Sequence, residues 1–368
     1  FPVKVPMVEM HTIGAGGGSI AWIDNGGGLR IGPESAGAFP GPACYGNGDC
    51  PTVSDANFIL GYLSAKNFLG GEMFIDVDKS RKAVEEKVAS KINLSVDDAA
   101  VGIRRLVDAN MCGGINVVST QKGYDLREFT LLAFGGGGSL HACELADELG
   151  IKRIIIPTNP GMFSAIGCQL AKVRYDYVRT AVKTTKQINV DEYNTIYAEM
   201  KKDAIRDLKA EGFDEKDLVF TATSDMRYIG QAWELSVPVP SNVKDMKEFD
   251  QCVKDFEAIH KRTYGYIMDD DVVFVNLRFT AFGIVPSLEF PASDEHVDET
   301  PATAKKGTRP MFFTDKFHES DVWDRALLPC GSKVHGPAMI EEYASSTPIP
   351  PKHTAEIDKY HNIIITHD

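Results

Sequence analysis

The sequence predicts an α/β protein whose first half is organised by glycine-rich turns. Three patterns support this prediction. A strand, a glycine loop, a helix and a second strand are expected in succession between residues 130 and 157. An Asn-Gly pair at residues 25–26 separates two apolar runs and predicts a β-hairpin. Apolar side chains at helical spacing predict helices over residues 78–91 and from residue 95 onward.

Residues 135–138 are four consecutive glycines, and they are the most informative feature of the chain. They follow an apolar stretch at residues 130–134, open a helical pattern at 140–149, and precede a second apolar stretch at 151–157. This order places bare backbone N–H groups and a helix N-terminus in front of an anion or a nucleotide. The alternative is a tight, closely packed turn that holds no ligand.

A second glycine cluster, residues 14–18, directly precedes the expected hairpin. The stretch 32–51 that follows is long, irregular and rich in Gly, Pro and Ala. A loop of that length inside a compact domain is usually either functional or disordered. Because Phe39, Cys44 and Tyr45 give it groups to bury, we expect an ordered loop that lines a site.

The helix expected from residue 95 onward has a capping-box-like start, since the Ser95 side chain can accept a hydrogen bond from an early helical N–H. Its apolar positions recur at helical spacing as far as Met111. The sequence Cys112-Gly113-Gly114 either lets another segment pack closely against this helix or ends it.

The composition changes near residue 180, which predicts two domains, residues 1–180 and residues 181–368. The second is expected to be α+β. It contains helical patterns over residues 190–213 and 246–263, strand patterns between them, and a turn-rich, β-like end.

The net charge of −13 argues against nucleic acid or an anionic membrane as the main partner. No apolar run approaches the roughly 18 residues that a membrane-spanning helix needs. Seven cysteines without paired CxxC spacing favour a cytoplasmic protein with reduced thiols, although Cys44 and Cys50 could form a loop disulfide or a metal pair. Nine scattered histidines argue against a histidine metal site.

The longest motifs of the chain resemble the A-type subunit of the hydantoinase/oxoprolinase family. That group includes N-methylhydantoinase, 5-oxoprolinase and subunits of acetone and acetophenone carboxylases. The matching segments are TIGAGGGSIA (12–21), residues 31–38 and 40–46, PTVSDAN (51–57), AFGGGGSLHA (133–142), DMRYIGQ (225–231), HKRTYGY (260–266), residues 276–278 and GPAMIEE (336–342).

The resemblance implies an actin-like ATPase fold with ribonuclease-H-like halves, the second of which is residues 1–180, and a partner-facing C-terminal domain. It also implies ATP and Mg²⁺ as cofactors. The family's Asp-x-Gly-Gly-Thr phosphate motifs do not occur here. The chain therefore looks like the second portion of an A subunit that is inactive alone and needs its N-terminal half and a B-type subunit.

Site residues follow from the matching motifs. The first glycine loop resembles a loop near the phosphates, and the second one resembles a loop that packs against adenine and ribose. Ser139 is expected to cap the helix behind the second loop. The implied nucleotide-binding residues are Gly14, Gly16, Gly17, Gly18, Ser19, Gly135, Gly136, Gly137, Gly138 and Ser139.

Three further residues have competing interpretations. Asp55 is either a Mg²⁺-associated catalytic carboxylate or a helix cap that binds backbone N–H groups. His141 contacts substrate or nucleotide, or it packs as a structural histidine. Cys44 is a nucleophile or a buried thiol. Polar groups of the C-terminal part, among them Asp225 and His260, form a partner surface or, as we prefer, an internal hydrogen-bond network.

The resemblance implies hydrolysis of a cyclic amide such as a hydantoin or 5-oxoproline, with ATP phosphorylating the carbonyl oxygen. The alternatives are a subunit of an ATP-dependent ketone carboxylase and a non-catalytic assembly half of either enzyme. Few acids and bases accompany the glycine loops, which fits phosphoryl transfer better than general acid–base hydrolysis.

Overall fold

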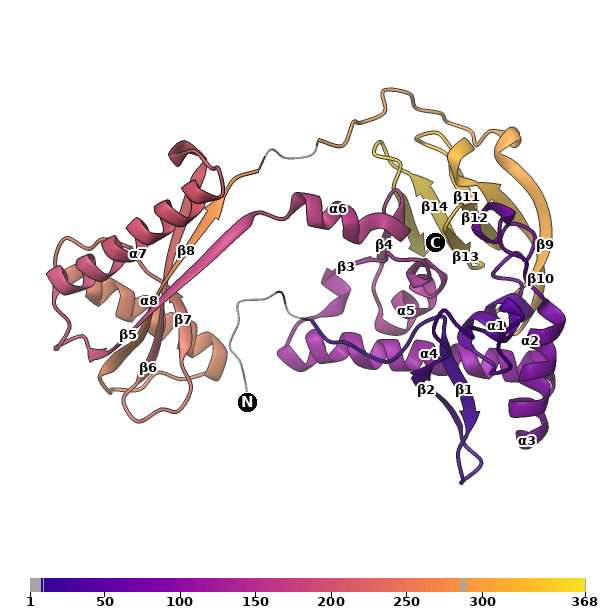
Figure 1. Cartoon of the computed structure of the whole chain (residues 1–368), viewed down its shortest axis with the longest axis horizontal. Helices are drawn as coiled ribbons and strands as arrows, with labels where there is room; N and C mark the ends of the chain where they lie inside the picture. The colour runs from indigo at the N-terminus through magenta and orange to yellow at the C-terminus, as the bar shows by residue number, and fades with distance from the viewer. Residues whose placement is uncertain (1–7, 9, 286–288, 368) are drawn as a thin grey trace. The chain divides into compact units, whose positions relative to one another are not determined.

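The computed structural model describes residue 8, residues 10–285 and residues 289–367 (Figure 1). These residues form two compact units. The main unit contains the described residues up to 167 together with residues 289–367, and the smaller unit contains residues 168–285. The mixture of helices and strands in the main unit confirms the predicted α/β class.

The compact units do not follow the single division predicted at residue 180. The last strand of the chain, β15 (Ile363–His367), pairs antiparallel with β4 (Arg153–Ile156). Because the C-terminal residues complete a sheet begun before residue 160, they pack with the first part of the chain. The predicted C-terminal domain is therefore split, and only its first portion forms the smaller unit.

Three sheets are found in the described part of the main unit. One is the hairpin of β1 (Ser19–Ile23) and β2 (Leu29–Ser35). The second has the order β13-β12-β10-β9 and the third has the order β11-β14-β15-β4-β3. Their remaining strands are β3 (Thr130–Leu132), β9 (Lys305–Phe313), β10 (Lys316–Asp324), β11 (Lys333–His335), β12 (Ala338–Glu342), β13 (Ser345–Ile349) and β14 (His353–Ile357).

The predicted strand, glycine loop, helix and strand are present. Strands β3 and β4 pair in parallel, as a crossover through a helix requires, and α5 (Ala142–Leu149) connects them. Gly150 ends α5 with a φ of 70°, a left-handed conformation that glycine adopts without strain. Buried side chains of α5 pack against β4, β14 and β15, so this unit contributes to one of the cores of the protein.

The predicted hairpin is also present, and Asp24 stabilises its turn. The carboxylate Oδ1 of Asp24 accepts hydrogen bonds from the N–H groups of Gly26 and Gly28, both at 2.9 Å. Gly27 has a φ of 79°, which explains why the turn is rich in glycine.

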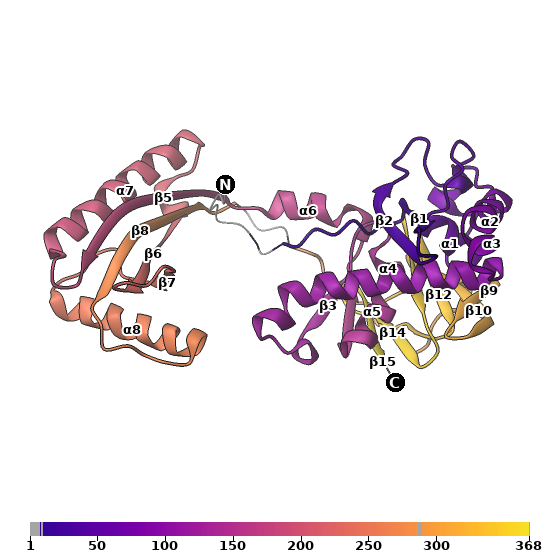
Figure 2. The ribbon, with the colours of Figure 1, turned by 90° about the horizontal axis from the view of Figure 1, so that it is seen from below.

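Helix α4 (Val96–Val118) is the long helix that runs past α1 (Val53–Ile59) and α5 (Figure 2). Ser95 caps it as predicted, since the Ser95 hydroxyl accepts from the Asp98 N–H at 3.1 Å. The helix continues past Gly113 and Gly114, so these glycines do not end it. A Cβ at Gly114 would lie 3.0 Å from Ile13, which confirms the alternative of close packing.

The helical pattern at residues 78–91 forms three consecutive segments that cover the core beside α1. They are α2 (Val77–Val84), a π-helical turn (Glu85–Ala89) and α3 (Ser90–Ile92). One more helix, α6 (Phe163–Leu170), follows the glycine-loop region.

The smaller unit is a four-stranded antiparallel sheet with two helices (Figure 1). The helices contact each other through Tyr193 and Phe249, whose ring centroids are 5.0 Å apart, and both pack on Phe274 and Phe279 of the sheet. Its elements are β5 (Val173–Thr184), α7 (Val190–Ala210), β6 (Leu218–Tyr228), β7 (Leu235–Pro238), α8 (Met246–Tyr264) and β8 (Val272–Gly283).

Within the described ranges, none of the helices combines the length and the apolar character that crossing a membrane requires.

Candidate functional site

A cleft of about 1070 Å³ lies in the main unit, and both predicted glycine loops line it. The first loop contributes Ala15 and residues 16–18, and the second contributes residues 135–138. The irregular stretch after β2 contributes Gly37, Ala38, Pro42 and Tyr45, so this ordered loop lines the cleft, and its role in a functional site stays a prediction.

The second glycine loop leaves backbone donors available. Gly135, with a φ of 89°, donates its N–H to the Pro160 carbonyl at 2.7 Å and fixes the start of the loop. The Gly137 carbonyl accepts from the Leu140 N–H at 3.2 Å. Among the described residues, the N–H groups of Gly136 and Gly137 have no acceptor. An anion in the cleft could therefore accept from both.

The first loop is built in a similar way. Ser19 is buried, and its Oγ accepts from the Gly16 N–H at 3.0 Å and contacts the Gly14 carbonyl oxygen at 3.4 Å. Gly14 and Ser19 do not line the cleft, so they shape the loop from behind. The N–H groups of Gly17 and Gly18 find no acceptor in the part of the chain that the structure describes.

The individual glycines of the two loops differ in whether a side chain could be added to them. A Cβ at Gly16 or Gly137 would meet nothing within 4 Å. A Cβ at Gly17 would lie 2.7 Å from the Ser54 hydroxyl, and one at Gly18 would lie 2.8 Å from the Ser35 hydroxyl. A side chain at Gly17 or Gly18 would therefore force Ser54 or Ser35 to move, whereas Gly16 and Gly137 leave space that a ligand can use.

The prediction that Ser139 caps the following helix is wrong. Neither the 3₁₀ turn at residues 138–140 nor α5 has a side-chain cap at its N-terminus. Ser139 is instead fully buried, with its Oγ 2.8 Å from the Ser345 hydroxyl and 2.8 Å from the Ser346 carbonyl oxygen. It ties the glycine loop to β13, and because that strand is some 200 residues away, local sequence gave no sign of it.

His141 lines the cleft and is almost fully buried. Its Nδ1 lies 2.5 Å from Oδ1 of Asp108, a residue of α4. An imidazole that donates from Nδ1 to a carboxylate presents Nε2 as its second polar atom. The structure therefore combines the two interpretations of His141, since the ring is held by a structural partner and also forms part of the cleft wall.

Asp55 has the geometry of the helix-cap alternative. It is fully buried, is absent from the cleft lining, and forms a capping box with Thr52 at the start of α1. Its carboxylate accepts from the Thr52 N–H (2.9 Å) and hydroxyl (2.7 Å), the Cys44 N–H (2.9 Å), the Ala43 N–H (3.2 Å) and the Ser80 hydroxyl (2.6 Å). Five donors occupy its two oxygens, so the catalytic and metal role stays a prediction that this geometry does not favour.

Cys44 is also fully buried, beside Asp55. Burial raises the pKa of the Cys44 thiol, and the Asp55 carboxylate raises it further. A thiol held in its neutral form is a poor nucleophile, so the buried-thiol alternative describes it better. Cys44 and Cys50 are both free thiols, as expected.

The C-terminal strands bring charged residues to the cleft that the sequence analysis did not select. Lys306 of β9 lines the cleft and lies 2.9 Å from Oε2 of Glu341 on β12, and Arg309 pairs with the other oxygen of Glu341. Burial alone would raise the pKa of Glu341, but the two cations hold it below its usual value. The sequence analysis quoted Glu341 only as part of the GPAMIEE motif, because its place beside the cleft depends on contacts between distant segments, such as the hydrogen bond from Asn67 Nδ2 to Glu341 Oε2 at 3.2 Å.

Arg104 of α4 is a second contribution that the sequence analysis missed. Its buried guanidinium donates to Asn57 Oδ1 at 2.8 Å, to Glu144 Oε1 at 2.9 Å and to the Leu140 carbonyl oxygen. Since Asn57 and Leu140 both line the cleft, Arg104 holds its two walls together from behind.

The polar residues of the smaller unit form the internal network that we preferred. Asp225 accepts from Asn276 Nδ2 at 2.9 Å and from Arg278 Nε at 2.8 Å. Nε2 of His260 lies 3.0 Å from the Gln231 amide nitrogen. These contacts account for Asp225, Gln231 and His260, whereas the buried Tyr228 hydroxyl has no hydrogen-bond partner among the described residues.

A mixed sheet with a glycine-lined cleft beside a crossover helix defines an α/β protein with a candidate ligand-binding cleft. More specifically, the chain belongs to the hydantoinase/oxoprolinase family. Residues 1–177 match the family model described as hydantoinase/oxoprolinase, and residues 180–367 match the model of the hydantoinase/oxoprolinase C-terminal domain.

The chain is similar to three relatives that have different named activities. The caprolactamase subunit alpha of Pseudomonas jessenii is 34% identical over 97% of this chain and 52% of that protein. The crystal structure of the ATP-dependent caprolactamase from that organism matches with a TM-score of 0.86 and 32% identity, covering 99% of this chain and 54% of that chain. The 5-oxoprolinase 1 of Arabidopsis thaliana is 27% identical over 99% of this chain and 30% of that protein.

The third relative is acetone carboxylase. Its nucleotide-free structure, from work on ATP-dependent acetone carboxylation, matches with a TM-score of 0.80 and 26% identity, covering 96% of this chain and 52% of that chain. The family thus includes ATP-dependent amidases and carboxylases. The chain spans about half the length of the caprolactamase and acetone carboxylase chains that it matches.

Proposed function

We propose that this chain forms the nucleotide-holding part of an ATP-dependent hydrolase that opens cyclic amides. The observation that carries the proposal is the convergence of both glycine loops on one cleft. Four N–H groups of residues lining that cleft, those of Gly17, Gly18, Gly136 and Gly137, have no acceptor among the described residues. Backbone donors fixed in advance suit phosphate oxygens in the case of Gly17 and Gly18, and the acceptor atoms of adenine and ribose in the case of Gly136 and Gly137.

The size and surface of the cleft are compatible with ATP. Ligand pockets commonly measure roughly 300–1,000 Å³, and this cleft of about 1070 Å³ slightly exceeds that range. The open Cβ positions of Gly16 and Gly137 allow a flat ring or a phosphate to approach the backbone closely. We assign adenine and ribose to the loop at residues 135–138, and the phosphates to the loop at residues 16–18.

When bound, ATP would supply a phosphoryl group that activates the amide carbonyl carbon for attack by water, after which the ring C–N bond breaks with the nitrogen leaving protonated and the phosphoryl group is released as inorganic phosphate. The residues of the chain position the nucleotide and the substrate and stabilise negative charge on their oxygens. The glycine N–H groups would donate to negative oxygens of the nucleotide from positions fixed before binding. His141, oriented by Asp108 at 2.5 Å, presents Nε2 as the polar contact to substrate or nucleotide.

Magnesium, which accompanies ATP, does not fit at Asp55, because five hydrogen-bond donors already occupy that carboxylate. Three other carboxylates line the cleft: Asp324, Glu341 and Glu342. Glu341 and Glu342 pair with cations. Asp324 forms no ion pair within the described residues, which makes it the carboxylate best suited to face a magnesium–nucleotide complex.

The substrate class follows from the relatives. A caprolactamase subunit is 34% identical to this chain and 5-oxoprolinase 1 is 27% identical, and both are named for cyclic amides. We therefore propose a lactam, hydantoin or 5-oxoproline-type substrate. The structural match to acetone carboxylase supports the second candidate, a ketone carboxylase that uses the same phosphoryl chemistry.

The names of the relatives also describe subunits, caprolactamase subunit alpha and acetone carboxylase beta subunit. We accordingly propose that activity requires the N-terminal half of the A-type subunit and a B-type partner. The deciding experiment measures phosphate release from ATP by the chain assembled with both. The panel contains caprolactam, 5-oxoproline, hydantoin, and acetone or acetophenone with bicarbonate.

Release that only cyclic amides stimulate would support the hydrolase. Stimulation only by a ketone with bicarbonate would replace it with the carboxylase. If no compound stimulated release from an assembly that binds ATP, both proposals would fail for the substrates tested. An assembly that does not bind ATP would refute the nucleotide assignment itself.

A further inference from the structure

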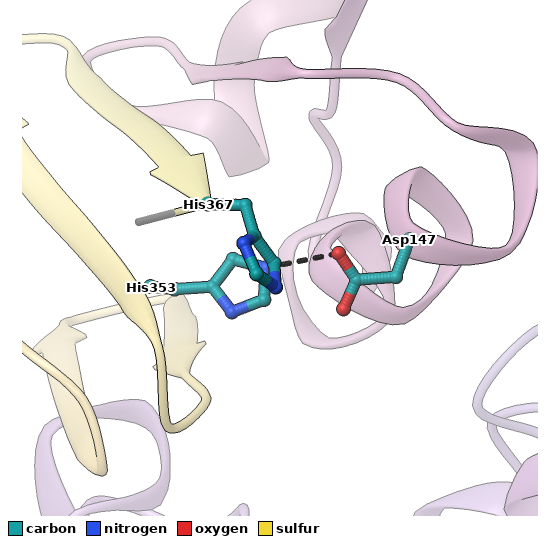
Figure 3. Close-up of side chains that lie close together, drawn as sticks. All are labelled: Asp147, His353 and His367. Atoms are coloured by element: carbon teal, nitrogen blue, oxygen red, sulfur yellow. Dashed lines mark hydrogen bonds and ion pairs between the residues drawn. The ribbon is translucent and has the colours of Figure 1, made fainter.

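Two histidines and an aspartate that are distant in sequence meet on the main unit, away from the cleft. Asp147 lies on α5, His353 on β14 and His367 on β15 (Figure 3). One possible ligand atom from each residue lies within 4.8 Å of those from the other two. None of the three lines the cleft, so the cluster is a separate feature.

The buried member of the cluster is held in the orientation that a metal ligand needs. His353 is 3% exposed, and its Nδ1 lies 3.4 Å from the Pro351 carbonyl oxygen. Its Nε2 faces Oδ1 of Asp147 at 3.0 Å. A ligating imidazole usually donates its other ring N–H to a carbonyl or carboxylate, and the Pro351 carbonyl can serve as that outer partner.

The other two ligands are placed to close around an ion. The His367 ring lies across that of His353, with the ring centroids 4.8 Å apart and the planes at 72°. His367 and Asp147 are both exposed, so their side chains can adjust and an ion can enter from solvent. In a tetrahedral site with bonds of about 2.0–2.1 Å, ligand atoms lie roughly 3.3 Å apart. The present atoms lie within 4.8 Å of one another, so metal binding requires the exposed side chains of Asp147 and His367 to move closer to His353.

We propose that Asp147, His353 and His367 form a binding site for a divalent transition metal of the zinc type. Two imidazole nitrogens and one carboxylate oxygen suit Zn²⁺, whereas Mg²⁺ and Ca²⁺ prefer an all-oxygen set. Three protein ligands leave a fourth tetrahedral position for water.

The bound ion connects the end of α5 to the β14–β15 hairpin. Helix α5 follows the glycine loop directly, so the ion stabilises the packing of that helix on the sheet. This role does not depend on the proposed ATP chemistry, and it can be tested without turnover.

The test is a titration of Zn²⁺ into the 368-residue chain after removal of metals with a chelator, followed by calorimetry. Two variants, His367→Ala and Asp147→Asn, change exposed side chains and leave the buried His353 in place. The matched control is His335→Ala, which removes an exposed histidine from β11 of the same sheet. Circular dichroism establishes that each variant is folded.

We expect one Zn²⁺ per chain, an affinity at least tenfold lower in each cluster variant, and no change in the control. Zn²⁺ should also raise the melting temperature of the parent chain and of the control, but not that of His367→Ala. Cobalt(II) in place of zinc should give the visible absorption of a four-coordinate site. Absence of stoichiometric binding, or binding that both cluster variants retain, would mean an adventitious ion only and would overturn the proposal.

Discussion

Replacing Gly137 with alanine tests the nucleotide assignment directly. In the free protein the substitution is harmless by every structural criterion. The backbone of Gly137 has φ −116° and ψ −8°, which alanine can adopt. The added Cβ would meet nothing within 4 Å. Replacing glycine at a compatible position stabilises a protein by about 0.4–1 kcal/mol, because the unfolded chain loses freedom. Gly137→Ala should therefore melt at the same temperature as the parent or slightly higher.

The affinity for ATP, in contrast to the melting temperature, should decrease in Gly137→Ala. If adenine or ribose packs against the loop, the new methyl group occupies space that the nucleotide needs. Forcing an extra methyl group into a well-packed contact costs about 1–3 kcal/mol. At about 1.4 kcal/mol per tenfold change, the affinity for ATP should fall roughly 5- to 150-fold.

The assay is titration with ATP, monitored by calorimetry or with a fluorescent analogue, using the chain assembled with its N-terminal half. Gly113→Ala is the matched control. Gly113 is also a glycine with no atom within 4 Å of an added Cβ, but it lies on α4 and does not line the cleft. If Gly137→Ala bound ATP as tightly as the Gly113→Ala control, the loop at residues 135–138 would not be the nucleotide cradle.

Three further predictions concern the polar groups. Asp55→Asn should lower the free energy of unfolding by about 2–3 kcal/mol in chemical denaturation, because buried hydrogen bonds to a carboxylate are lost; a selective loss of Mg²⁺-dependent ATP binding without that destabilisation would restore the metal role. His141→Gln should reduce phosphate release by the full assembly more than it weakens ATP binding, and an equal effect on both would make the histidine only a binding contact. Lys306 and Arg309 hold the pKa of Glu341 in the folded protein below its usual value despite burial. The ionised Glu341 therefore stabilises the fold at pH values above the unfolded pKa of about 4.3. This stabilisation is lost as the pH falls through the folded pKa. Unfolding of Glu341→Gln, followed against pH, should therefore show a flatter decline in acid than the parent.

The sequence predicted those parts of the fold and of the site that depend on residues close together in the chain. The turn at residues 135–138 could be predicted because a run of glycines between a strand-like and a helix-like stretch marks a tight connection between them. The hairpin could be predicted because its turn requires positive φ, which Gly27 adopts. The Ser95 cap could be predicted because the bond spans only three residues.

The parts that could not be predicted depend on pairings between distant segments. The antiparallel pairing of β15 with β4 joins residues about 200 positions apart, and no local pattern specifies it. The same pairing brings His367 near Asp147, which is why histidines scattered along the sequence form a cluster in space. Ser139 failed as a predicted cap for this reason as well, since its partners are Ser345 and Ser346.

These long-range contacts change what the C-terminal residues are expected to do. A purely partner-facing domain would leave the cleft to the first half of the chain. Instead, β9 brings Lys306 to the cleft wall, and the residues around the β12–β13 turn bind the glycine loop through Ser139. Because the loop's buried hydroxyl is satisfied by residues 345–346, removing residues 289–367 would expose the core of α5 and leave that hydroxyl without its partners. The proposed nucleotide cradle is therefore formed by both ends of the main unit, and the first 180 residues alone would not be expected to bind ATP.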